Sequence, residues 1–273
     1  MMQLRKVIGI LVLLALVAGV GCSRLTFVKP KFKRDFHQTG PEYTVRDDPR
    51  DVQRIAAIDQ VALAEQGLRT GQLDDAETHA RAAIKADPGS TDAYTLLAMI
   101  QEQRGNESQA GTLYAKAVSL APTRGVLLNN YGAWLCGNGQ AAASLGLFDR
   151  ALQDSTYPTP ASALANSGSC ALEAGQDERA SRDLARALEL DPSSEVALEA
   201  MAESEFKAGH YLEARAFSER RLSVAPASVK MLQLASQIEQ KLGDTVAAAR
   251  YVQRIGTEFP QQRTVPSGDA KQR

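Results

Sequence analysis

The sequence has no excess of basic charge and few aromatic side chains. Its 273 residues carry 31 Lys and Arg against 32 Asp and Glu, a formal net charge of −1, so it lacks the basic footprint expected of a nucleic-acid-binding protein. Aromatic residues make up 5% of the chain, whereas hydrophobic residues make up 44%. Because strands favour aromatic and β-branched residues, this balance favours an all-α fold with a substantial core.

The sequence also lacks the motifs of the common enzyme chemistries. Its three histidines, His37, His79 and His210, are far apart, and none has Cys, Asp or Glu at a metal-ligand spacing. It has no phosphate-binding glycine loop and no GxSxG motif. We therefore expect a protein that is not an enzyme and that uses no metal, cofactor or small-molecule substrate.

One long hydrophobic run stands near the start of the chain. Arg5 and Lys6 precede an uncharged apolar stretch from 7 to 20, which is followed by small residues up to Cys22. As a helix, this stretch would span roughly 21 Å, less than the ~30 Å hydrocarbon core of a bilayer. The pattern therefore predicts a secretory signal over residues 1–21.

The end of the signal, AGVGC, resembles the lipobox of bacterial lipoproteins, although Gly19 stands where that family usually has Leu. The resemblance implies that Cys22 becomes the lipid-modified N-terminus, and that Ser23 sorts the protein to the outer membrane. Two or three acyl chains give stable membrane attachment. The open alternative is an ordinary signal peptide that is cut nearby.

A basic segment follows the predicted anchor. Residues 22–56 are expected to form the anchor and a tether, with Arg24, Lys29, Lys31, Lys33 and Arg34 clustered near Pro30. The tether either contacts anionic lipid head groups or is a solvated linker.

A period of 34 residues runs through the rest of the chain. Prolines close successive units at Pro88, Pro122, Pro192, Pro226 and Pro260. Each unit contains a glycine followed five residues later by a small residue; the glycines are Gly71, Gly105, Gly139, Gly175, Gly209 and Gly243. The interval from Pro122 to Pro192 holds two periods plus two residues, which fall in the loop TYPTP at 156–160.

These positions are the ones that define tetratricopeptide repeats. The resemblance implies an all-α, right-handed superhelical solenoid of six helix-turn-helix units. The units are 57–90, 91–124, 125–160, 161–194, 195–228 and 229–262, and residues 263–273 are expected to be a mobile tail. The TYPTP loop is expected to weaken stacking between the third and fourth units, and packing is less regular at Gly67 and Arg221.

Cys136 and Cys170 are one repeat apart, in the first helices of adjacent units. In an oxidising compartment, stacked neighbours bring such cysteines within reach of a disulfide. We expect this bridge to form. The alternative is a pair of buried free thiols that act as small hydrophobic residues.

The first helices of such a solenoid line its inner, partner-binding surface. The first unit places Ile58, Val61, Glu65 and Leu68 on this row. An exposed apolar stripe typically marks an interaction site, so we hypothesise a groove for a segment of another protein. Alternatively, residues 42–55 fold back and cover the stripe.

Three longer stretches resemble one family of lipoproteins. They are NNYGAWLC at 129–136, YPTPASALANSGSCALEAG at 157–175, and LQLASQIEQKLGDTVAAARYVQRIGTEFP at 232–260. They are similar to the type IV pilus biogenesis and stability lipoproteins, the PilF/PilW pilotin family, whose members carry an inter-repeat cysteine bridge.

The resemblance implies a lipid-anchored protein of the Gram-negative outer membrane that faces the periplasm. Such a protein binds secretin subunits of the type IV pilus and promotes their localisation and multimerisation. Two alternatives stay open. One is a repeat lipoprotein of another envelope machine, serving a tight-adherence pilus or outer-membrane barrel assembly. The other is an accessory of a peptidoglycan enzyme.

Overall fold

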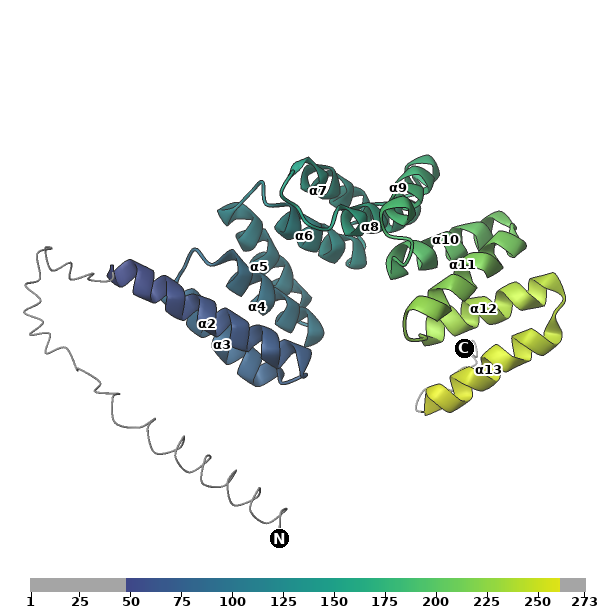
Figure 1. The fold of residues 1–273 in the computed structure, drawn as a ribbon, viewed down its shortest axis with the longest axis horizontal. Helices are drawn as coiled ribbons and strands as arrows, with labels where there is room; N and C mark the ends of the chain where they lie inside the picture. Colours follow the sequence, from purple (N-terminus) through teal and green to yellow (C-terminus); the bar gives the residue numbers. More distant parts are fainter. Residues whose placement is uncertain (1–47, 261–273) are drawn as a thin grey trace, which may run out of the picture. The chain divides into compact units, whose positions relative to one another are not determined.

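The computed structural model describes residues 48–260, and within this range it contains twelve α-helices and no strand. The helices are α2 (Pro49–Arg69), α3 (Leu73–Ala86), α4 (Thr91–Gln103), α5 (Glu107–Leu120), α6 (Gly125–Gly137), α7 (Ala141–Gln153), α8 (Pro160–Glu173), α9 (Asp177–Leu190), α10 (Glu195–Ala208), α11 (Tyr211–Val224), α12 (Val229–Leu242) and α13 (Thr245–Glu258). Each even-numbered helix pairs with the next helix to form a hairpin, and successive hairpins contact each other (Figure 1). The predicted all-α class and the repeated hairpins are confirmed.

The six repeated glycines form the turns between the two helices of each hairpin. All six have a positive φ, between 70° and 84°, and they are the only described residues with this conformation. Glycine adopts the left-handed region without the steric cost that a Cβ atom imposes. The 34-residue glycine period therefore marks the end of each first helix, as predicted.

The first helix begins earlier than the sequence analysis predicted. Residue 57 was expected to start the first unit, but α2 begins at Pro49. The Asp48 side chain accepts a hydrogen bond from the Arg50 backbone N–H at 2.9 Å, and Pro49 occupies the first helical turn. Both features favour helix initiation, so the predicted end of the tether at residue 56 is wrong.

The loop at 156–160 contributes to the core. Tyr157 is buried in a cluster with Leu128, Ala151 and Ala163, which come from α6, α7 and α8. Asp154, just before the loop, accepts a hydrogen bond from the Gly125 backbone N–H at the start of α6, at 2.7 Å. This bond lowers the pKa of Asp154, with a further contribution from Thr156. Through Tyr157 the loop packs against both neighbouring hairpins. The expectation that the two inserted residues weaken the stacking here stays a prediction.

The two irregular positions are accommodated by different means. A Cβ atom on Gly67 would lie 3.0 Å from the Cβ atom of Ala76, so α2 and α3 approach too closely there for a large side chain. Arg221 is buried, and its guanidinium pairs with Glu195 and donates to the backbone oxygen of Pro226 at 3.2 Å. A close backbone contact replaces a side chain in the first case, and an ion pair replaces apolar packing in the second.

Candidate binding surfaces

The predicted groove on the first helix is divided between core and surface. Val61 and Leu68 pack against the buried cluster formed by α2, α3 and α4, which includes Leu97 and Ile100. Ile58 is 60% exposed, and the Glu65 side chain is also exposed. Val61 and Leu68 are partly buried, with one side packed against the hairpin core, and Ile58 and Glu65 are more exposed. The hypothesis that the four residues line a partner-binding groove stays a prediction.

An exposed apolar stripe also runs along the first half of α2. Val52, Ile55 and Ile58 are 51%, 58% and 60% exposed, and their three-residue spacing places them on one helix face. Val52 and Ile55 were not expected on this face because the helix was predicted to start at residue 57. The Asp48-Pro49 pair, a capping residue followed by an N1 proline, was the signal that would have found them.

Part of the segment 42–55, which was the alternative cover for the stripe, belongs to α2. Residues 49–55 continue α2 without folding back, and Val52 and Ile55 are themselves exposed. The alternative that 42–55 covers the stripe is therefore wrong for this part. Tyr43 and Val45, which that alternative also invoked, lie outside the described residues.

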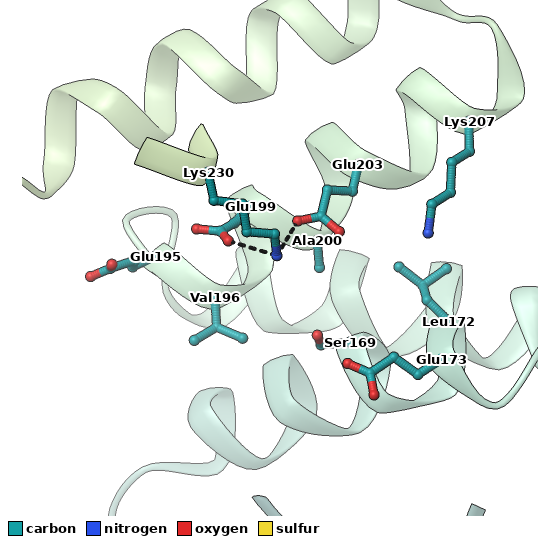
Figure 2. A pocket seen from close by; sticks show the side chains of 10 residues that line it. All are labelled: Ser169, Leu172, Glu173, Glu195, Val196, Glu199, Ala200, Glu203, Lys207 and Lys230. Atoms are coloured by element: carbon teal, nitrogen blue, oxygen red, sulfur yellow. Dashed lines mark ion pairs between the residues drawn. The ribbon is translucent and has the colours of Figure 1, made fainter. Parts of the chain in front are cut away.

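A second surface lies on α8, α10 and α12, where ten side chains line a pocket of about 180 Å³ (Figure 2). They are Ser169, Leu172, Glu173, Glu195, Val196, Glu199, Ala200, Glu203, Lys207 and Lys230. Glu195, Glu199 and Glu203 are spaced four residues apart, so they occupy one face of α10. Leu172, Val196 and Ala200 give the same pocket an apolar component.

Lys230 links the carboxylates of this pocket. Its Nζ atom lies 3.1 Å from Glu199 and 2.5 Å from Glu203 (Figure 2). Burial alone would lower the pKa of Lys230, but the hydrogen bonds and charges of Glu203 and Glu199 outweigh this effect and raise it. Arg221 lies beside the same carboxylates, with its Nε atom 3.5 Å from Glu199. These groups already neutralise one another, which suits contact with a polar segment better than a reaction that needs a free acid or base.

Cys136 and Cys170 lie on α6 and α8, the first helices of the third and fourth hairpins. The structure pairs their sulfur atoms, with a Cα–Cα distance of 5.8 Å. This distance is typical of disulfides. Both cysteines belong to a buried cluster with Leu145 and Phe148, so a bond here would join two stacked hairpins. Its formation in the cell stays a prediction.

Several sequence predictions lie outside the described residues. They are the signal at 1–21, the lipid site Cys22, the basic part of the tether and the tail at 263–273. In the described part of the chain, no helix is long and apolar enough to cross a membrane. Within residues 48–260, no group of three or more His, Cys, Asp or Glu side chains is arranged to hold a metal ion.

Comparisons with known proteins agree with the repeated hairpins. The model of the tetratricopeptide-repeat family matches residues 61–124 and 135–195. The sequence is 27% identical, over 215 residues, to the type IV pilus assembly protein PilF of Pseudomonas aeruginosa, covering 78% of this chain and 84% of that protein.

Two solved structures are also similar. The crystal structure of PilW, described as a widely conserved type IV pilus biogenesis factor, is 30% identical with a TM-score of 0.68, covering 75% of this chain and 94% of that one. The structure of Pseudomonas aeruginosa PilF has a TM-score of 0.66 at 24% identity, covering 78% and 95% of the two chains. The similarity therefore extends over most of the repeat region.

Proposed function

Because this chain belongs to the tetratricopeptide-repeat proteins of type IV pilus biogenesis, we propose that it is a pilotin of the outer membrane. In this proposal it binds the secretin of the type IV pilus and promotes the localisation and multimerisation of that secretin. It acts as a binding scaffold and catalyses no reaction. The observation that carries the proposal is the similarity to PilW and PilF over most of the chain.

The N-terminal sequence supports the membrane part of the proposal. A basic start, a short apolar run and the AGVGC ending precede Cys22, and Ser23 follows it. An acylated Cys22 would hold the protein at the periplasmic face of the outer membrane. The helices that follow would then carry the binding surface.

The exposed stripe on α2 supports the binding part of the proposal. Val52, Ile55 and Ile58 form an exposed apolar row with Asp51 and Asp59 beside it, and such a row gains free energy when a partner removes it from water. We assign the secretin contact to this stripe. The secretin segment that fits it has an apolar face of its own.

Deletion of the protein tests the proposal as a whole. In a strain that lacks it, we expect the secretin to remain monomeric and to be reduced in the outer-membrane fraction. Membrane fractionation followed by electrophoresis without heating in detergent separates rings from monomers. Normal secretin rings in the deletion strain would reject the pilotin function.

Paired substitutions test the assignment of the stripe. Ile55→Ser with Ile58→Ser should weaken secretin binding by roughly tenfold or more, because two exposed apolar anchors are lost. The midpoint of thermal unfolding should change little. Leu212→Ser with Val246→Ser is the matched control, since these side chains are 65% and 67% exposed but lie on α11 and α13. Equal loss of binding in both pairs would remove the stripe from the contact.

A single substitution tests the anchor. Cys22→Ser removes the sulfur that would carry lipid, so we expect the protein to leave the outer-membrane fraction. Metabolic labelling with a fatty acid should mark the wild-type protein and leave the variant unlabelled. Labelling of the variant to the wild-type level would show that Cys22 is not the acylated residue.

A further inference from the structure

One repeated position is covered by the next hairpin in five units and uncovered in the sixth. We call it the stacking position: the residue nine places after each turn glycine. In the first five hairpins it is Ala80, Tyr114, Phe148, Leu184 and Ser218, with exposed fractions between 0% and 4%. In the sixth it is Val252, which is 56% exposed.

The following hairpin completes the burial of this position, which also packs against the first helix of its own hairpin. Leu184 and Ala187 of α9 pack with Ala197 and Ala200 of α10, and Met201 of α10 lies against the same cluster. The first helix of the next unit therefore covers the second helix of the unit before it. No described helix follows α13, so its equivalent face has no such cover.

The uncovered face of α13 is uncharged and lined by small or aliphatic residues. Thr245, Ala249 and Val252 are exposed, and Gly256 is partly exposed on the same face. Small residues such as Ala249 and Gly256 permit a second helix to approach closely. In an isolated repeat array, an end facing water is normally polar.

The other end of the array carries polar residues at two of the equivalent positions. Ala93 and Ile100 of α4 are fully buried against the first hairpin. One repeat earlier, on α2, the equivalent residues are Asp59 and Gln66, and both are exposed. Leu63, the equivalent of the buried Leu97, is 41% exposed on this face. Polar residues therefore replace apolar ones at part of the face of the first hairpin, whereas the face of α13 has no charged residue.

The chain that follows α13 does not carry the pattern of a seventh first helix. The buried face of α12 includes Met231, Leu232, Ala235 and Ile238. One repeat later the sequence has Val265, Pro266, Asp269 and Gln272. A proline and two polar residues at these positions would neither sustain the helix nor bury its face.

We propose that the face formed by Thr245, Ala249, Val252 and Gly256 binds one amphipathic helix of a partner protein. This helix continues the stacking of the hairpins and presents an uncharged stripe of small and aliphatic residues, with the spacing of Ala197, Ala200 and Met201 on α10. A second copy of this chain fits less well, because the end it would offer carries Asp59 and Gln66. The inference does not depend on the secretin contact of α2.

A fluorescent label at the stacking position tests the proposal. The full chain carries Val252→Cys, modified with an environment-sensitive dye, together with Cys22→Ser. The Cys22→Ser chain without the new thiol is the labelling blank, so that any reaction at Cys136 and Cys170 is subtracted. The probe is a synthetic peptide of residues 195–208, which covers the equivalent face of α9. We expect a saturable blue shift of the dye, and binding about tenfold or more weaker for the same peptide with Ala200→Glu and Met201→Glu.

The control label is placed at Leu212→Cys, a site of similar exposure on the internal helix α11. The dye there should not respond to the peptide. Three results would overturn the proposal: no saturable shift at position 252, a shift that depends on protein concentration without peptide, or a shift present without peptide that is lost when residues 263–273 are removed. The second result would identify a second copy as the occupant, and the third would identify the tail.

Discussion

The junction between the third and fourth hairpins and the one between the fifth and sixth hairpins are built from different interactions. The first buries Phe148, Tyr157 and the Cys136–Cys170 pair. At the second, the buried carboxylate of Glu239 on α12 is bound by Arg215 of α11, with 2.9 Å between Nε and Oε1. Hairpins of the same repeat can therefore stack through apolar side chains or through ion pairs, provided that each buried charge has a partner.

The largest effect is expected at the apolar junction. Phe148 is fully buried among Leu145, Cys136 and Cys170, so Phe148→Ala should lower the free energy of unfolding by about 3–5 kcal/mol. Urea unfolding followed by circular dichroism measures this loss. Phe148→Leu, the matched control, keeps most of the volume and should lose less. Equal losses in both variants would contradict a role for volume at this site.

The cysteine pair should have the next largest effect. The bond would close a loop of 34 residues, and loop entropy then gives roughly 3–4 kcal/mol of stabilisation. The Cys136→Ala and Cys170→Ala double variant should lose this amount. Reduction of the wild-type protein should expose two thiols and lower its unfolding midpoint to a similar degree. The same thiol titre before and after reduction would show that no bridge forms.

The ionic junction offers a smaller and different loss. Arg215→Ala leaves the Glu239 carboxylate, whose side chain is 5% exposed, without its partner, which should cost about 2–3 kcal/mol because Arg215 itself is partly solvated. Replacing both residues by Met should restore most of the loss. Urea midpoints of the three proteins make the comparison. A double variant as unstable as Arg215→Ala would show that the charges contribute more than the volume.

The smallest effect concerns an ionic contact between the first and second hairpins. Burial alone would raise the pKa of Glu77, but Arg81 and Arg104 outweigh it and lower the pKa below its usual value of 4.5. A carboxylate with a lowered folded pKa stabilises the fold above its unfolded pKa, and this contribution is lost as pH falls through the folded value. Glu77→Gln should therefore lose less stability than wild type between pH 6 and pH 3, measured by urea midpoints.

Much of the fold was predictable because the helix ends and turns of each repeat depend on the conformational preferences of nearby residues. Glycine stands at the six predicted turns because each turn needs a positive φ. Cys136 and Cys170 could be placed in adjacent first helices because 34 residues, the length of one repeat, separate them. The burial of single side chains was less predictable where it depends on residues that are distant in the sequence. Val61 and Leu68 are partly buried because one side of each packs against the cluster of α2, α3 and α4, and Tyr157 is buried because three helices meet around it.

The position of the Cys136–Cys170 pair also has a mechanical consequence. Force applied between a lipid anchor at Cys22 and the partner helix proposed at α13 would load the chain between them, whereas a contact at α2 would leave residues 136–170 unloaded. When the Cys136–Cys170 bond is formed, tension passes through the sulfur atoms and bypasses residues 137–169. These residues would span about 110 Å as an extended chain, at ~3.4 Å per residue. With the bond formed they do not extend under force, even when the flanking hairpins unfold.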